Sequence, residues 1–101
     1  NGINSSKKYL SLLFNLLKKN DIQIFLIVYP WPAQIYYDDF HHEKIWEEFA
    51  NENKVSFLSF YNLFNKKNLS SINENFIPGD VHWNQKGSKL IFNALIDSGI
   101  L

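Results

Sequence analysis

Ile22-Gln23-Ile24-Phe25-Leu26-Ile27-Val28-Tyr29 is the stretch that decides the fold class. Apart from Gln23, every residue in it is aliphatic or aromatic, and the pattern does not alternate beyond its first residues. A near-continuous run of β-branched and aromatic residues is typical of a strand buried on both faces, as in a parallel sheet. We therefore predict a buried parallel strand here.

The segments around this strand have the order expected of a layered α/β protein. Residues 4–19 carry apolar side chains at helical spacing, and a helix that leads directly into a buried strand favours such a fold. A second strand is predicted at 55–60. A final amphipathic helix is predicted at 85–97, with Asn84 as its cap and Gly87 allowing close packing near its start. With right-handed crossovers, the two strands would be parallel and covered by helices.

The remaining segments are predicted from their polar residues and from the residues that start or end helices. Asp38 and Asp39 indicate the start of a helix, and apolar residues follow them at helical spacing. We expect a one-turn helix at 61–64 and loops at 31–37 and 65–75, the second of them polar and on the surface. This order of elements is half of a flavodoxin-like three-layer fold.

Pro30-Trp31-Pro32 ends the first strand abruptly, because proline cannot continue a central strand. In open α/β sheets, ligands bind at the carboxyl ends of parallel strands, which is where this segment is expected. Trp31 is therefore a candidate substrate-binding residue, as part of a rigid aromatic wall suited to a sugar ring. The alternative is that the aromatic residues here pack over the sheet edge.

A carboxylate and an imidazole lie two residues apart in the stretch Pro78-Gly79-Asp80-Val81-His82-Trp83-Asn84-Gln85-Lys86-Gly87. In an extended segment, residues i and i+2 point to the same side, so Asp80 and His82 can share a face. A histidine takes a proton from a serine hydroxyl only when its other ring nitrogen is held in the right tautomer, which a carboxylate does. His82 is therefore a candidate general base, and Asp80 is its candidate orienting group.

The same stretch resembles a known family. Gly79 to Gly87, followed by an amphipathic helix, resembles the last conserved block of the SGNH (GDSL-type) hydrolase superfamily, which supplies the Asp and His of a Ser-His-Asp triad. The resemblance implies a three-layer αβα flavodoxin-like parallel sheet, with His82 and Asp80 as catalytic residues and with neither a cofactor nor a metal. It also implies that residues 1–101 are the C-terminal portion of a single domain of this type, and the start at Asn1, close to a helical pattern, agrees with this expectation.

The spacing within the motif leaves the reaction type open. The commonest spacing in the superfamily is Asp-x-x-His, whereas this chain has Asp-x-His. The Asp-x-His-Trp form is similar to the one found in SGNH-like enzymes that O-acetylate exopolysaccharides. The resemblance therefore implies either an esterase acting on a small acyl ester or an acetylated carbohydrate, or a carbohydrate O-acetyltransferase.

The nucleophile of such a triad is not visible in the chain. None of the serines occurs in a Gly-Asp-Ser or Gly-x-Ser-x-Gly setting, and the resemblance places the serine upstream. We therefore expect this chain alone to be inactive. Trp83 is a second candidate substrate-binding residue, and its alternative role is to anchor the start of the final helix.

Composition excludes several classes of function. Ten basic and ten acidic residues give a net charge of zero, so there is no electrostatic case for binding nucleic acid or an anionic membrane. The longest uninterrupted apolar run, 24–28, is too short to span a bilayer. The absence of cysteine excludes a disulfide scaffold and a thiolate nucleophile. Composition points to no particular compartment or oligomeric state.

Two other functions compete with the triad. Gly-Asp-x-His also opens the metal site of dinuclear metallophosphoesterases, but that motif needs further ligand blocks downstream, and only a helix follows Asp80 and His82. His41 and His42 are adjacent in a predicted helix, and their side chains diverge, which favours a structural or surface role over metal binding.

The second competing function is non-catalytic. The chain would then be an α/β interaction module, or a relative that has lost its serine.

Overall fold

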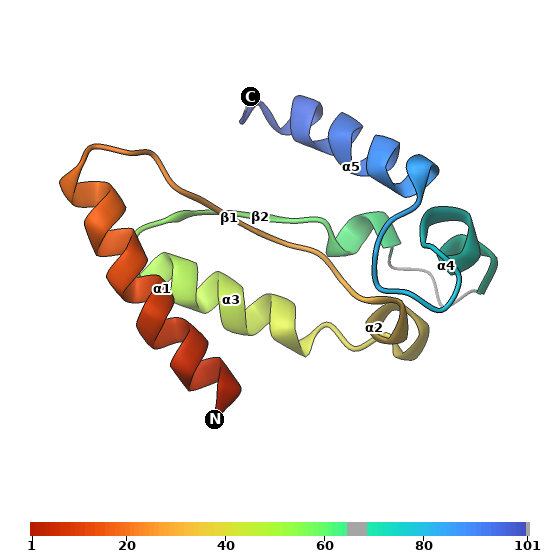
Figure 1. Cartoon of the computed structure of the whole chain (residues 1–101), viewed down its shortest axis with the longest axis horizontal. Helices are drawn as coiled ribbons and strands as arrows, with labels where there is room; N and C mark the ends of the chain where they lie inside the picture. Colours follow the sequence, from red (N-terminus) through yellow and green to blue (C-terminus); the bar gives the residue numbers. More distant parts are fainter. Residues whose placement is uncertain (65–68, 101) are drawn as a thin grey trace.

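The computed structural model describes residues 1–64 and 69–100, which form a mixed α/β structure. In chain order the elements are α1 (Gly2–Lys19), β1 (Phe25–Val28), α2 (Pro32–Tyr37), α3 (His41–Glu52), β2 (Ser56–Ser59), the 3₁₀ turn η1 (Tyr61–Phe64), α4 (Leu69–Asn75) and α5 (Gln85–Ser98). In Figure 1, α1 and α3 lie on one side of the two strands and α5 lies on the other.

The two strands pair in parallel, as the sequence predicts, with Phe25 opposite Ser56 and Val28 opposite Ser59. Both are shorter than predicted, with four residues each. The prediction that the first strand is buried on both faces is wrong for the described residues, because the side chain of Ile27 is 38% exposed. Helices bury the faces of a parallel sheet, and the cover over Ile27 is incomplete among the described residues. In this part of the chain the sheet consists of β1 and β2.

Two apolar clusters hold the helices against the strands. Phe14 of α1 and Phe49 of α3 pack against Leu26 of β1. On the other side of the sheet, Leu58 of β2 packs against a larger cluster. Its six buried members each come from a different element or connecting segment: Ile35, Phe60, Phe64, Ile72, Phe76 and Ile91. Because this second cluster includes Phe76, it also fixes the start of the segment that carries Asp80.

The prediction of a loop at 31–37 is wrong, because Pro32–Tyr37 form α2. Pro32 occupies the first helical position, where a missing N–H leaves no hydrogen bond unmade. The side chain of Gln34 accepts a hydrogen bond from the Trp31 N–H at 2.8 Å, which caps the new helix. Ile35 is 1% exposed and anchors α2 in the core.

The polar surface loop predicted at 65–75 is also wrong over its second part, because Leu69–Asn75 form α4. Residues 65–68 of that prediction lie outside the described residues. Ile72 and Asn75 are buried, and the Asn75 side chain donates to the Ser71 carbonyl at 2.8 Å. The sequence does not indicate this short helix clearly, because Leu69 and Ile72 are its two aliphatic residues and its other five residues are polar.

Over residues 1–64 and 69–100, no helix combines the length and the apolar character needed to cross a membrane.

Candidate active site

A tight turn places Asp80 at the surface. Its backbone N–H donates to the Ile77 carbonyl at 3.0 Å, with Pro78 and Gly79 at the two central positions. Gly79 has a φ of 72°, the left-handed value required at the third position of a type II turn, and proline suits the second position. An added Cβ at Gly79 would meet nothing within 4 Å, so glycine serves the backbone conformation here and not close packing.

Asp80 and His82 lie against each other, as their spacing predicts. One carboxylate oxygen, Oδ1 of Asp80, lies 2.6 Å from Nδ1 of His82. The same oxygen accepts hydrogen bonds from the backbone N–H groups of Val81 at 2.6 Å and of His82 at 3.2 Å. The carboxylate therefore holds both the imidazole and the backbone that carries it.

The contact between these two residues determines the tautomer of the imidazole. An ionised carboxylate can only accept hydrogen bonds, so Nδ1 of His82 must carry the hydrogen. In the neutral ring the lone pair is then on Nε2, which has no hydrogen-bond partner among the described residues. This is the arrangement a general base needs, with one nitrogen held by a carboxylate and the other free to take a proton.

The pair is open to solvent, with 73% of the His82 side chain and 43% of the Asp80 side chain exposed. The hydrogen bond from the His82 side chain, followed by that from the His82 backbone, holds the pKa of Asp80 below its usual value. Asp80 is therefore a carboxylate at neutral pH. An exposed ion pair contributes little to folding, so stability does not explain why these two groups are held together.

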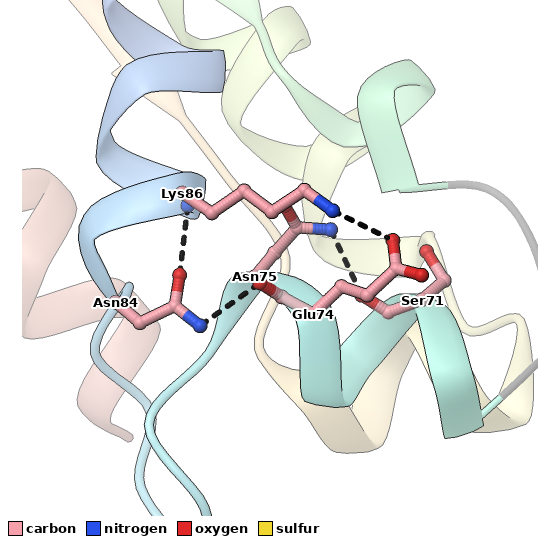
Figure 2. Close-up of polar contacts among 6 residues, drawn as sticks. Ser71, Glu74, Asn75, Asn84 and Lys86 are labelled. Carbon is pink, nitrogen blue, oxygen red and sulfur yellow. Dashed lines mark hydrogen bonds and ion pairs between the residues drawn. The ribbon is translucent and has the colours of Figure 1, made fainter.

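The ends of the segment that carries the pair are joined to each other, as Figure 2 shows. The Asn84 N–H donates to the Asn75 carbonyl at 3.0 Å, and the Asn84 side-chain amide donates to the Glu74 carbonyl at 2.9 Å. The oxygen of the same side chain accepts from the Gly87 N–H at 2.9 Å, which caps α5 as predicted. Asn84 therefore links the end of α4 to the start of α5.

Close packing at Gly87 completes this junction. A Cβ on Gly87 would overlap the Asn75 carbonyl and would lie 3.1 Å from the Cβ of Trp83. Glycine is therefore required where α5 begins, as the sequence predicts. Lys86 and Glu74 add an exposed ion pair at 3.4 Å, drawn in Figure 2.

Two pockets adjoin this region, and Trp31 lines both of them. The first, which we call the Asp80 pocket, has a volume of about 250 Å³ and lies between the start of α2, α4 and the turn; its walls include Trp31, Pro32, Asn73, Ile77, Pro78 and Asp80. The second, which we call the β1-end pocket, has a volume of about 310 Å³; its walls include Tyr29, Trp31, Gln34, His42, Trp46 and Tyr61. Trp31 is 56% exposed, and its predicted role in substrate binding stays a prediction.

Trp83 occupies a different environment from Trp31. Its ring centroid lies 4.6 Å from that of Tyr29, and it packs against the core cluster that includes Phe76 and Ile91. Its Nε1 is buried without a hydrogen-bond partner among the described residues. The walls of the two pockets do not include Trp83, so the structure separates the two predicted substrate-binding residues.

Gln34, Asn73 and Tyr61 were not identified as site residues from the sequence. The Tyr61 hydroxyl lies 3.4 Å from the Gln34 oxygen, and burial raises the pKa of this phenol. The spacing of Gln34, three residues after Trp31, is that of a helix cap and was the available signal for its position. Asn73 and Tyr61 carry no local signal, because only the packing of distant segments brings them to the pockets.

In the part of the chain that the structure describes, no three side chains of the metal-ligating types His, Cys, Asp and Glu come together. Asp80 and His82 thus have no third candidate ligand beside them within residues 1–64 and 69–100.

Comparison of the chain with protein-family models, with curated proteins and with solved structures gave no match. The function is therefore argued from the geometry of the Asp80 turn and of the two pockets.

Proposed function

We propose that the chain supplies the acid-base half of a serine esterase of the SGNH (GDSL-type) superfamily. In this proposal His82 is the general base and Asp80 is its orienting carboxylate. The nucleophilic serine belongs to a segment that precedes Asn1 in the whole protein. The substrate is an acyl ester, and an O-acetylated carbohydrate is the preferred candidate.

The contact between Asp80 Oδ1 and His82 Nδ1 carries this proposal. It is 2.6 Å long, it assigns the hydrogen to Nδ1, and it leaves Nε2 free on a side chain that is 73% exposed. If Asp80 and His82 served only as a helix cap or a surface ion pair, Nε2 of His82 would not need to be free. The segment that carries the two residues would not need a separate anchor either. The junction at Asn84 supplies such an anchor.

The fold assigned in this proposal is a three-layer αβα flavodoxin-like sheet, of which residues 1–101 are the C-terminal portion. The parallel pairing of β1 with β2 and the helices on both sides of the strands support it. The free edge of β1 would then pair with a preceding strand, because an open parallel sheet adds strands at such an edge.

The proposed mechanism follows from the free nitrogen of His82. Nε2 takes the proton of the serine hydroxyl as its oxygen attacks the ester carbonyl, and the resulting imidazolium then protonates the departing alcohol. Water attacks the acyl-serine with the same base, which releases the acid and regenerates the serine. Asp80 stabilises the imidazolium throughout. If a sugar hydroxyl replaces water in the second step, the same site transfers the acyl group, which is the acetyltransferase alternative.

The deciding experiment is an esterase assay of the whole protein with 4-nitrophenyl acetate. We expect His82→Ala to lower kcat by roughly 10³-fold or more, since a triad without its base loses most of its rate enhancement. His41→Ala is the matched control, because His41 is an exposed histidine at the start of α3, outside the walls of both pockets. Equal activity of wild type and His82→Ala would rule out the proposed role.

A further inference from the structure

Trp31 lies where two pockets meet. It lines both the β1-end pocket and the Asp80 pocket, and it is 56% exposed. Pro30 precedes it and Pro32 begins α2, so its backbone is held by two rings and by the Gln34 cap. An exposed indole that lines both pockets, on a backbone held in this way, is suited to contact two neighbouring parts of one ligand.

The β1-end pocket has the composition of a ligand site. Four of its wall residues are aromatic, namely Tyr29, Trp31, Trp46 and Tyr61, and Gln34 and His42 add polar groups. The Tyr61 hydroxyl is protonated at neutral pH, with its pKa raised by burial, and it lies within hydrogen-bond reach of the Gln34 oxygen at 3.4 Å. Its oxygen can accept a hydrogen bond from a ligand hydroxyl. The pocket therefore offers flat apolar faces together with a few hydrogen-bonding groups.

Charge selects among the ligands that such a pocket could hold. Neither pocket has a lysine or an arginine in its wall, and Asp80 lines one of them. The negative charges of Glu43 and Asp39 contribute to the raised pKa of Tyr61, which lines the β1-end pocket. Nearby carboxylates without a cationic wall residue disfavour an anionic ligand. A neutral ring with apolar C–H faces and hydroxyl groups matches the walls.

Size sets how much of a ligand each pocket can take. The two volumes, about 310 Å³ and about 250 Å³, lie near the lower limit of small-molecule sites, which span about 300–1,000 Å³. Each pocket therefore suits a single sugar ring. A longer ligand would have to extend past Trp31 from one pocket into the other.

We propose that the β1-end pocket is a second saccharide subsite, and that the ligand is an uncharged oligosaccharide whose successive rings bind on either side of Trp31. The acylated ring occupies the Asp80 pocket, and this part of the assignment rests on the proposed function. Occupation of the β1-end pocket does not require the serine or its chemistry.

The test measures the binding of saccharides to the whole protein carrying His82→Ala. Tryptophan fluorescence and calorimetry give the affinities. The probes are mono-, di- and trisaccharides of glucose, galactose and N-acetylglucosamine. We expect at least one series to bind about tenfold more tightly as the disaccharide than as the monosaccharide. Trp46→Ala should remove this gain, because Trp46 lines the β1-end pocket and does not line the Asp80 pocket. Trp46→Phe should restore part of it.

Phe92→Ala is the control, since Phe92 is an exposed aromatic residue of α5 that lines neither pocket. The proposal is overturned if no neutral series gains affinity with length, or if trigalacturonate or tetramethylammonium binds more tightly than the neutral sugars. Length-dependent saccharide binding, together with no esterase activity in the wild-type protein, would contradict the proposed function alone. Esterase activity without any gain from a second ring would contradict the second subsite alone.

Discussion

Oδ1 of Asp80 is hydrogen-bonded both to Nδ1 of the His82 side chain, at 2.6 Å, and to the backbone N–H of His82, at 3.2 Å. The single intervening residue also donates its N–H to this oxygen. The carboxylate therefore couples the orientation of the imidazole to the conformation of the turn. A substitution at Asp80 therefore affects both the orientation of the imidazole and the conformation of the turn. A substitution that keeps the oxygen but removes the charge separates these two effects.

Asp80→Asn should abolish most of the proposed activity while preserving the fold. The Asn oxygen can still accept the backbone N–H groups of Val81 and His82, but the charge that stabilises the imidazolium is lost. We expect kcat to fall by about 10⁴-fold, as in a triad whose Asp is replaced by Asn, with little change in Tm. Esterase assays and thermal melts measure the two effects. Asp97→Asn, at an exposed position of α5, is the control and should leave both unchanged.

The pH dependence of the pair follows from the direction of the Asp80 shift. Its pKa in the folded chain lies below the reference value of 3.8 because His82 donates to the charged form. A lowered pKa means that the contact stabilises the fold above the unfolded pKa and that this contribution is lost as the pH falls through the folded pKa. Carboxyl ¹³C titration should therefore give a midpoint below 3.8 for Asp80. A midpoint at or above that value would mean that the contact is absent in solution.

Gly87→Ala should destabilise the chain, because the new Cβ would overlap the Asn75 carbonyl, a backbone atom that cannot rotate away. Overpacking of this kind costs typically about 1–3 kcal/mol of unfolding free energy. Urea denaturation measures the loss. Gly2→Ala is the matched control, since a Cβ there meets nothing within 4 Å and Gly2 also lies in the first turn of a helix. Equal midpoints for the two variants would contradict the packing observed at Gly87.

The parts of the fold that depend on local pattern could be predicted from the sequence. The apolar run at 22–29 indicated a parallel strand, and the Asn84 cap and the contact between Asp80 and His82 follow from neighbouring residues. The helix at Pro32–Tyr37 was missed because prolines suggest a break, although a proline at the first helical position is compatible with a helix.

The pockets could not be predicted, because they form between segments distant in sequence. The Asp80 pocket requires the start of α2 to lie beside α4 and the turn at Gly79. No local pattern indicates that contact, and α4 itself was interpreted as a loop because it is polar apart from Leu69 and Ile72. The Asp-His half of the site is therefore local and predictable, whereas the shape of the space beside it is a property of tertiary packing.

Two substitutions at Asn84 should separate the two hydrogen bonds of its side chain. Asn84→Ala removes both the cap on Gly87 and the donor to Glu74, and we expect a loss of about 0.5–2 kcal/mol, the usual effect of deleting a helix cap. Asn84→Asp keeps an oxygen for the cap but loses the donor and places a carboxylate near the Glu74 carbonyl. Because the cap is kept, Asn84→Asp should retain most of the stability measured by urea denaturation.

If the junction also positions Asp80 and His82, Asn84→Asp should lower kcat more than its small loss of stability would suggest, with KM unchanged. Asn93→Ala, at an exposed position within α5, is the control and should change neither quantity. An unaltered kcat in Asn84→Asp would show that the link between α4 and α5 supports the fold but does not position His82.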